Sequence, residues 1–373
     1  MLCWMPGPKS YTGEDTIEIY THGGQAVFQS FFNVLSSFKN VNYAEQGEFS
    51  KRAIMNGKMN LVEAEAINDL INSQTEAQRE LATKQYKDGL AEYIKDWRKK
   101  LIKCMSLVEA TIDFSDEEDA PETLKIEKEL LEILTGMKKA IKNKDYYELI
   151  KDGAKVVLKG KPNVGKSSIF NKIVKKEKSI VSNQPGTTRD IIESAVNLKG
   201  YAVIFYDTAG IENTKNKIEK EGIRRARLLQ KESDIILHVI EREEDIPKQI
   251  KKNELIILNK IDKLGQMKKN YDKVIFISAL KGQGFEDLLE SIYKKILKKT
   301  KDLKKDDLLI SNARQQKELC RALENIEAAL QEKSEEIISE HLRQASRNLS
   351  RIMGTIDVEE ILGNIFSSFC IGK

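Results

Sequence analysis

Residues 160–167 read Gly160-Lys161-Pro162-Asn163-Val164-Gly165-Lys166-Ser167 and match the phosphate-binding pattern G-x-x-x-x-G-K-[ST]. The apolar run 156–158 precedes this stretch, and a helix-like run begins at Ser168 directly after it. The pattern requires this strand–loop–helix context, because glycines let backbone N–H groups curl around phosphate and the helix N-terminus adds a favourable dipole. The stretch therefore predicts a P-loop in an α/β domain, with Lys166 at the β- and γ-phosphates and Ser167 on Mg²⁺.

Two short motifs further along the chain supply the remaining phosphate-side groups. Asp207-Thr208-Ala209-Gly210 follows the apolar run 201–206, so its acid can hold Mg²⁺ through water and Gly210 can give its N–H to the γ-phosphate. Upstream, Gly186-Thr187-Thr188 supplies a threonine hydroxyl for Mg²⁺ in a loop that begins with glycine. Either motif alone would suit a surface turn. In this order beside a P-loop, both indicate a nucleotide-hydrolysing switch.

The choice of base depends on Asn259-Lys260-Ile261-Asp262, which follows another apolar run. The Asp262 carboxylate can accept N–H bonds from N1 and N2 of guanine. Adenine lacks the amino group and would leave that carboxylate unpaired, at a cost of about 1–3 kcal/mol. Ser278-Ala279-Leu280 follows the run 274–277 and would complete the pocket through backbone N–H groups. The predicted ligand is GTP.

Ile211 stands where many GTPases carry the glutamine that orients the attacking water. Glu219, on a helix-like stretch, is the best local replacement. From spacing alone an exposed helix charge is the better interpretation of this residue.

Composition bounds the remaining possibilities. The 373 residues suit two or three domains, and 40% hydrophobic with 32% charged residues fit a core-forming protein rich in exposed helix. No long apolar run predicts a membrane span, and the first residues lack the pattern of a signal peptide. Sparse cysteines without paired spacing favour a reducing, cytoplasmic setting. Two lysine-rich runs, 172–178 and 294–305, suit solvated helix faces or RNA contacts, and charge alone does not separate these.

Helical periodicity flanks the α/β stretch on both sides. Apolar residues recur at helix spacing over 90–108 and again over 338–352, whereas the runs between them are short and continuous, as in strands buried on both faces. Each helical stripe needs a partner, and pairing the two with each other is the simplest solution. The expected domains are 1–56, helical 57–152, α/β 153–298 and helical 299–373, with the α/β domain inserted into the helical one.

The whole chain resembles the MnmE (TrmE) family of GTPases that modify wobble uridines of tRNA. The resemblance is carried by stretches outside the GTPase motifs: Ser10–Asp15 (SYTGED), His22–Gly24 (HGG), Gly47–Ala53 (GEFSKRA), Leu61–Ile67 (LVEAEAI) and Phe366–Lys373 (FSSFCIGK). It implies an α/β plus α fold, in which a Ras-like P-loop GTPase domain is inserted into a helical domain after a small α/β folate-binding and dimerisation domain. The family has a segment before Ser10–Asp15 that this sequence lacks, so the folate-binding domain is expected to be incomplete.

The resemblance also implies roles for individual residues. Mg²⁺ would use Ser167 and Thr188, Glu219 matches the family's catalytic glutamate, and Cys370 lies in the terminal Cys-x-Gly-Lys motif. A near-terminal cysteine in an apolar helix is otherwise usually a buried hydrophobic residue. The expected K⁺ ligands are Asn163, Ser182, Gln184 and Thr187, and the expected contacts of a 5-formyltetrahydrofolate-type ligand are Glu18, Lys58 and Lys373. The expected nucleotide-binding set is Asn163, Val164, Gly165, Lys166, Ser167, Ser168, Ser182, Asn183, Gln184, Pro185, Gly186, Thr187, Thr188, Asp207, Thr208, Ala209, Gly210, Asn259, Lys260, Asp262, Ser278, Ala279 and Leu280.

The implied activity is K⁺-dependent GTP hydrolysis that drives carboxymethylaminomethylation of tRNA wobble uridine at C5. The implied partners are tRNA, a second copy of the chain in a homodimer, and the FAD-containing subunit MnmG in a heterotetramer. Two alternatives remain: a K⁺-dependent ribosome-assembly GTPase, and a truncated GTPase without modifying activity. The flanking helical blocks and the Cys370-bearing end favour the first interpretation, and no Gly-x-x-Gly loop of a KH module follows the GTPase motifs.

Overall fold

The computed structural model describes residues 1–113, 123–177, 179–180, 192–207, 224, 228–263, 274–300 and 310–355. The chain divides into two compact units, which we call the helical unit and the sheet unit. The helical unit comprises Met1–Asn72, Ala82–Lys144 and Leu308–Lys373, and the sheet unit comprises Ser73–Leu81 and Asp145–Asp307. Within the described residues, no helix has the length and apolar character needed to cross a membrane.

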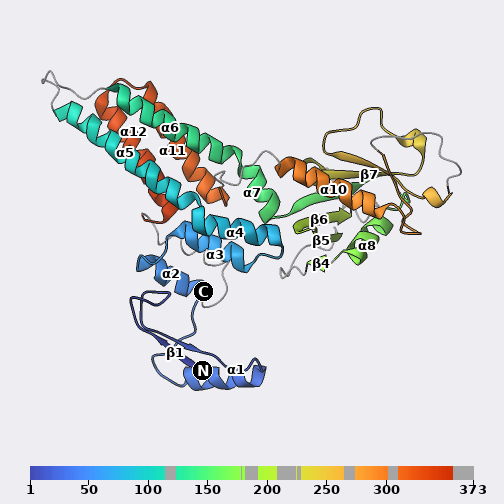
Figure 1. Ribbon diagram of the computed structural model, residues 1–373, viewed down its shortest axis with the longest axis horizontal. Coiled ribbons are helices and arrows are strands. Elements are labelled where there is room, and N and C mark those ends of the chain that lie inside the picture. Colours follow the sequence, from blue (N-terminus) through green and yellow to red (C-terminus); the bar gives the residue numbers. More distant parts are fainter. Residues whose placement is uncertain are drawn as a thin grey trace. The chain divides into compact units, whose positions relative to one another are not determined.

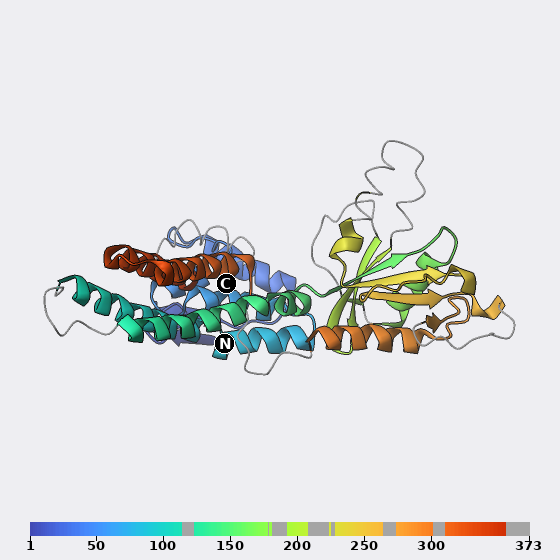
Figure 2. The same cartoon turned by 90° about the horizontal axis from the view of Figure 1, so that it is seen from above.

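Long helices from both ends of the sequence build the helical unit. Helices α5 (Leu90–Asp113), α6 (Thr123–Lys142), α11 (Ala313–Gln331) and α12 (Glu335–Met353) lie side by side (Figures 1 and 2). The two predicted apolar stripes share one core, in which Leu101 and Leu349 are fully buried. In the first stripe, 90–108, Tyr93 does not belong to this core, because it is 41% exposed. Burial of each large aliphatic side chain contributes about 1.5–3 kcal/mol, so this shared core holds the two stripes together.

A polar cluster joins α3 (Leu61–Ile71) to the start of α11 and the end of α12. The Arg314 guanidinium donates to both carboxylate oxygens of Glu65 at 3.0 Å, and also to the main-chain carbonyls of Arg351 and Ile352. Those carbonyls belong to the last turn of α12, where the helix lacks its own donors. Because Arg314 satisfies them, the cluster fixes where α12 ends against α3.

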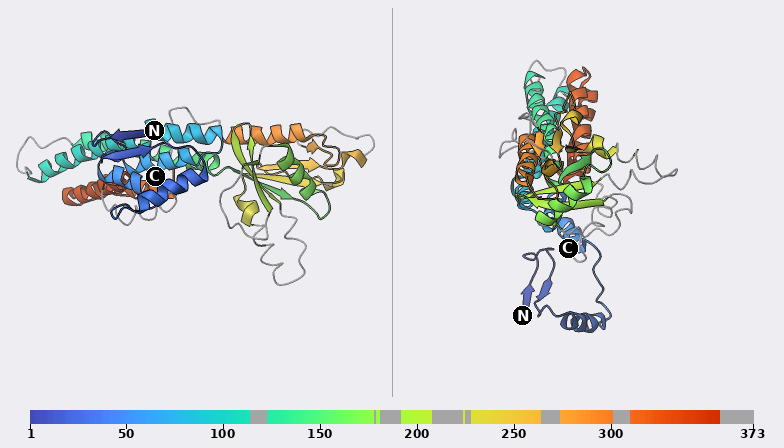
Figure 3. Two further views of the ribbon diagram at one scale, coloured as in Figure 1. Left: turned by 90° about the horizontal axis from the view of Figure 1, so that it is seen from below. Right: turned by 90° about the vertical axis from the view of Figure 1, so that its right-hand side faces the viewer.

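The first residues form a small separate group of elements within the helical unit. Strand β1 (Leu2–Met5) pairs antiparallel with β2 (Thr16–Ile19), and α1 (Gln25–Ser36) and α2 (Glu48–Met55) follow (Figure 3). Helix α1 buries none of its residues, and its Phe28 side chain is more than half exposed. Apolar side chains of the two strands are exposed as well, among them Trp4 and Ile17, each at 58%.

A mixed seven-stranded sheet in the order β4-β5-β6-β3-β7-β8-β9 organises the sheet unit. Strands β6, β3, β7, β8 and β9 run parallel, whereas β4 and β5 are antiparallel to their neighbours. The strands are β3 (Ala154–Lys159), β4 (Ser179–Ile180), β5 (Ile192–Leu198), β6 (Tyr201–Asp207), β7 (Ile235–Ile240), β8 (Glu254–Leu258) and β9 (Val274–Phe276). The predicted apolar runs form β3, β6, β7, β8 and β9, but β9 lies at the edge of the sheet and is only partly buried.

Helices cover the sheet and complete its core. Apolar side chains of α8 (Lys166–Lys176) and α10 (Phe285–Thr300) share one cluster with the strands, including Ile169 and Phe285 (Figure 2). The remaining described elements are α4 (Glu76–Asp88), α7 (Lys144–Lys151) and the short 3₁₀ helices η1 (Glu243–Asp245) and η2 (Ile261–Lys263). Since the carboxyl ends of parallel strands meet at one edge, the end of β6 and the segments that follow β3, β7, β8 and β9 lie there.

Candidate nucleotide-binding site

The P-loop connects the end of β3 to the start of α8. Two of its glycines are required by close approach and backbone conformation. A Cβ at Gly160 would lie 2.3 Å from the carbonyl oxygen of Val239, and one at Gly165 would lie 2.3 Å from Asn259 Nδ2. Gly165 also has a φ of 99°, which favours glycine. The loop is therefore packed against the neighbouring strand ends.

The Lys166 side chain folds into this loop. Its residue is 3% exposed, and its Nζ donates to the carbonyl oxygens of Gly160 at 2.6 Å and Lys161 at 3.1 Å. An ammonium held inside a ring of main-chain groups at a helix N-terminus is well placed to meet a phosphate. Ser167 and Ser168 follow in the first turn of α8, and both are exposed.

Asn259 links three loops at the same edge of the sheet. The side chain is buried, donates through Nδ2 to the Val164 carbonyl at 2.8 Å, and accepts from the Ala279 N–H at 3.0 Å. The side-chain amide of Asn259 thus ties the predicted segment 259–262 to two others, 160–167 and 278–280. A buried amide with both ends satisfied stiffens its surroundings, so the loops hold a defined mutual position.

Asp262 and Ser278 form the next contact in this group. The Ser278 hydroxyl donates to Asp262 Oδ1 and accepts from the Lys281 N–H. This hydrogen bond from Ser278 is the main cause that lowers the pKa of the Asp262 carboxyl, which therefore stays ionised and can accept hydrogen bonds. Leu280 is 80% exposed, so any part it plays in the site is through its main chain.

Lys260 reaches back across the P-loop. Its Nζ donates to the carbonyl oxygen of Asn163 at 2.8 Å and to Glu241 Oε2 at 2.9 Å. Close by, Lys161 pairs with Asp245 at 2.6 Å. Glu241 and Asp245 were not among the residues predicted from sequence. For Glu241 the available signal was its position directly after the buried strand β7, because Asn259 follows β8 in the same way.

Asp207 ends β6 beside the strand that leads into the P-loop. It is 2% exposed, and its Cα partner in the register is Leu158 of β3. A buried carboxylate at this edge brings an oxygen donor close to the start of the loop. The predicted site residues that lie outside the described residues are Ser182, Asn183, Gln184, Pro185, Gly186, Thr187, Thr188, Thr208, Ala209, Gly210, Glu219, Cys370 and Lys373.

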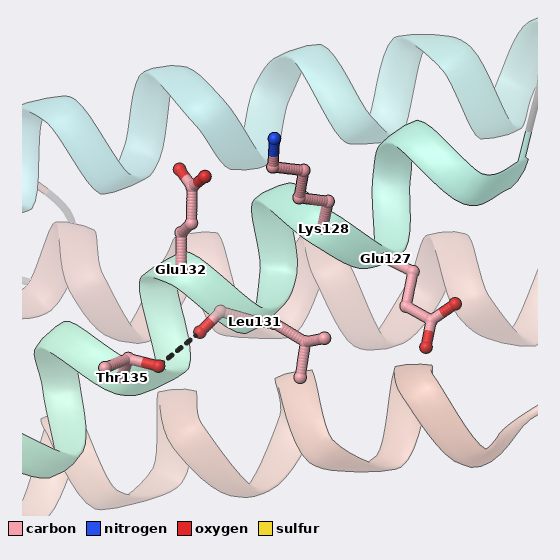
Figure 4. Close-up of a pocket in the computed structure, with 5 residues that line it drawn as sticks. All are labelled: Glu127, Lys128, Leu131, Glu132 and Thr135. Carbon is pink, nitrogen blue, oxygen red and sulfur yellow. Dashed lines mark hydrogen bonds between the residues drawn. The ribbon is translucent and has the colours of Figure 1, made fainter.

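The predicted folate contacts belong to the helical unit and have different partners. Glu18 on β2 accepts a hydrogen bond from Tyr20, whereas Lys58 Nζ donates to the Pro8 carbonyl at 2.7 Å. A shallow hollow on the exposed face of α6 is lined by residues between Glu127 and Thr135 (Figure 4). Its chemistry is that of a helix surface: the Thr135 hydroxyl donates to the Leu131 carbonyl at 2.8 Å. It contains none of the predicted site residues.

Comparison with known proteins places this geometry in a family. Residues 61–370 match the MnmE helical domain, and residues 1–58 match the N-terminus of the GTP-binding protein TrmE. The tRNA modification GTPase MnmE of Pelagibacter ubique is 40% identical over 386 residues, which cover 100% of this chain and 86% of the relative. The corresponding protein of Hyphomonas neptunium is 38% identical over 98% of this chain and 84% of the relative.

Two solved structures each align with part of the chain. The G domain of the T. maritima FeoB iron transporter is 29% identical and covers 38% of this chain and 98% of that chain, with a TM-score of 0.30. A GTP-binding protein from Sulfolobus solfataricus in complex with GDP is 21% identical and covers 54% of this chain and 67% of that chain, with a TM-score of 0.29. The sequence matches, which span nearly the whole chain, show that it belongs to the MnmE family of tRNA modification GTPases.

Proposed function

We propose that this chain binds GTP at the edge of the sheet described above and hydrolyses it. Asp262 and the 278–280 segment would bind the guanine base, and the loop 160–167 would bind the phosphates. The observation that carries the proposal is the Asn259 side chain, which ties the P-loop and the Ala279 N–H together. With these loops already positioned, less ordering is required when the nucleotide binds.

The donors near the P-loop fit the proposed metal ions. Mg²⁺ prefers hard oxygen ligands, and Ser167 and the buried Asp207 supply them at this edge, with Thr188 as the further proposed ligand. For K⁺ the proposed ligands are Asn163, Ser182, Gln184 and Thr187. Asn163 is exposed, and its side-chain amide oxygen is the group proposed to contact the cation.

The proposed mechanism divides the work among the chain's own residues. Lys166 would hold the β- and γ-phosphates, and Glu219 would orient the attacking water in place of the glutamine that the chain lacks. A bound monovalent cation would supply positive charge opposite the transferring phosphoryl group, as an arginine does in other GTPases. Asp262, ionised because Ser278 donates to it, would select guanine over adenine.

We propose further that hydrolysis drives carboxymethylaminomethylation of tRNA wobble uridine at C5, together with MnmG in a heterotetramer built on a homodimer of this chain, in the cytoplasm. The proposed domains are a GTPase domain, 153–298, inserted between helical segments 57–152 and 299–373, after an N-terminal domain, 1–56. A 5-formyltetrahydrofolate-type donor would contact Glu18, Lys58 and Lys373, and Cys370 would take part in the modification. Support comes from the family to which the chain belongs.

Nucleoside mass spectrometry of total tRNA tests this proposal. The gene would be deleted and then restored as wild type or as Lys166→Ala. Loss of C5-aminomethyl-type wobble uridines on deletion, recovery with wild type and no recovery with Lys166→Ala would support a GTP-driven modification. Unchanged uridines in the deletion strain would refute it and direct attention to ribosome profiles. Purified protein assayed in KCl and NaCl tests the cation separately, since equal GTP turnover in both salts would exclude the K⁺ site.

A further inference from the structure

The segment after β7 supplies acids to two lysines, one in the P-loop and one beside it. Glu241 Oε2 lies 2.9 Å from Lys260 Nζ, and Asp245 Oδ1 lies 2.6 Å from Lys161 Nζ. The two lysines differ in their further contacts. Lys260 Nζ also donates to the main-chain carbonyl of Asn163, at 2.8 Å, whereas the Lys161 side chain is 74% exposed. The Glu241 pair is therefore the one whose ammonium also holds the phosphate-binding loop.

The backbone at both ends of this contact is unusual. Lys260 has a φ of 64° and Asn163 a φ of 62°, in the left-handed region that residues other than glycine seldom adopt. Such conformations persist where surrounding contacts determine them, and they concentrate at functional sites. The Lys260 ammonium joins the two residues directly, so its position is coupled to the conformation of both loops.

We propose that Glu241 is a positioning residue of the nucleotide site: its carboxylate holds Lys260 against the Asn163 carbonyl before the nucleotide binds. A free lysine side chain has many rotamers, and ordering it on binding would lower the affinity. Because the Asn163 carbonyl and the Glu241 carboxylate both accept from the Lys260 ammonium, less ordering of this side chain is needed when the nucleotide binds. This inference rests on the proposed function, because it assigns Glu241 to the same guanine nucleotide site.

The charges around the pair agree with this role. Side-chain exposure is 27% for Lys260 and 41% for Glu241, so water screens the pair only in part. The hydrogen bond from Lys260 is the main cause that lowers the pKa of the Glu241 carboxyl, with further contributions from Lys263 and Arg242. The carboxylate is thus charged at neutral pH, and Glu241→Gln removes the charge while keeping the shape.

Calorimetric titration of the full chain with GDP tests the proposal. Glu241→Gln should weaken GDP binding by about three- to tenfold, the range expected for a partly exposed, charge-assisted contact. Glu244→Gln, an exposed acid three residues further along, is the matched control and should bind GDP within about twofold of wild type. Affinity that is unchanged or increased in Glu241→Gln would overturn the proposal.

A double-variant comparison separates positioning from a general structural effect. If Glu241 acts through Lys260, Glu241→Gln should cause no further loss in a Lys260→Met background. An equal loss in both backgrounds would overturn the inference.

Inosine diphosphate gives a second readout, because its base lacks the amino group from which Asp262 would accept a hydrogen bond. Glu241→Gln should weaken GDP and inosine diphosphate by the same factor, and a changed ratio would indicate a distorted base pocket instead. Failure of the wild type to bind GDP would refute the proposed function itself.

Discussion

Replacing Asn259 by alanine should weaken guanine nucleotide binding strongly, because one side chain positions two loops. The change removes the hydrogen bonds to the Val164 carbonyl, at 2.8 Å, and from the Ala279 N–H, at 3.0 Å. Each such bond contributes about 0.5–1.5 kcal/mol net, so about 1–3 kcal/mol of loop positioning is lost. If the nucleotide must restore that order, GDP affinity falls by about 5- to 150-fold.

The matched control lies at the other end of the same strand. Asn253 precedes β8, as Asn259 follows it, and its Nδ2 makes a long contact of 3.5 Å with the Ser233 carbonyl. Asn253→Ala should therefore leave GDP affinity within about twofold of wild type, since such a contact contributes little. Both variants would be titrated with GDP by calorimetry, with circular dichroism to check folding. A folded Asn259→Ala that binds GDP as well as Asn253→Ala would refute the reasoning.

Four further predictions concern other residues. Asp262→Asn should reduce GTP affinity and admit xanthosine nucleotide in competition binding. Because Ser278 lowers the pKa of Asp262, GDP binding should persist as the pH falls through the usual carboxyl range, and in Ser278→Ala the loss of binding should begin at higher pH. Glu219→Ala should leave nucleotide binding intact and slow GTP turnover by roughly 10²-fold, whereas normal turnover would make Glu219 a solvated charge. Glu65→Ala should destabilise the helical unit by about 3–5 kcal/mol in thermal unfolding, because the largely buried Arg314, 19% exposed, loses its carboxylate partner, while GDP affinity stays unchanged.

Local sequence patterns were sufficient for much of the sheet unit. Continuous apolar runs predicted β3, β6, β7, β8 and β9, and all of these except the edge strand β9 have a neighbouring strand on both sides. Strand β5 was missed because its sequence, Ile192-Glu193-Ser194-Ala195-Val196-Asn197-Leu198, mixes polar and apolar residues. It pairs antiparallel with β6 and has only the two-residue β4 on its other side, so its sequence carries no continuous apolar signal.

The P-loop motif and the guanine motif could be recognised from sequence because each works through residues adjacent in the chain. The helical stripes were also visible, since a helix repeats every 3.6 residues. Only the tertiary structure decided which residues meet across long separations: Arg314 with Glu65, 249 positions apart, and Glu241 with Lys260 against Asn163. Such pairs depend on strand order and on the place where each helix ends. Hydrophobic periodicity fixes which face of an element is buried, but it contains no information about which distant polar group a side chain will reach.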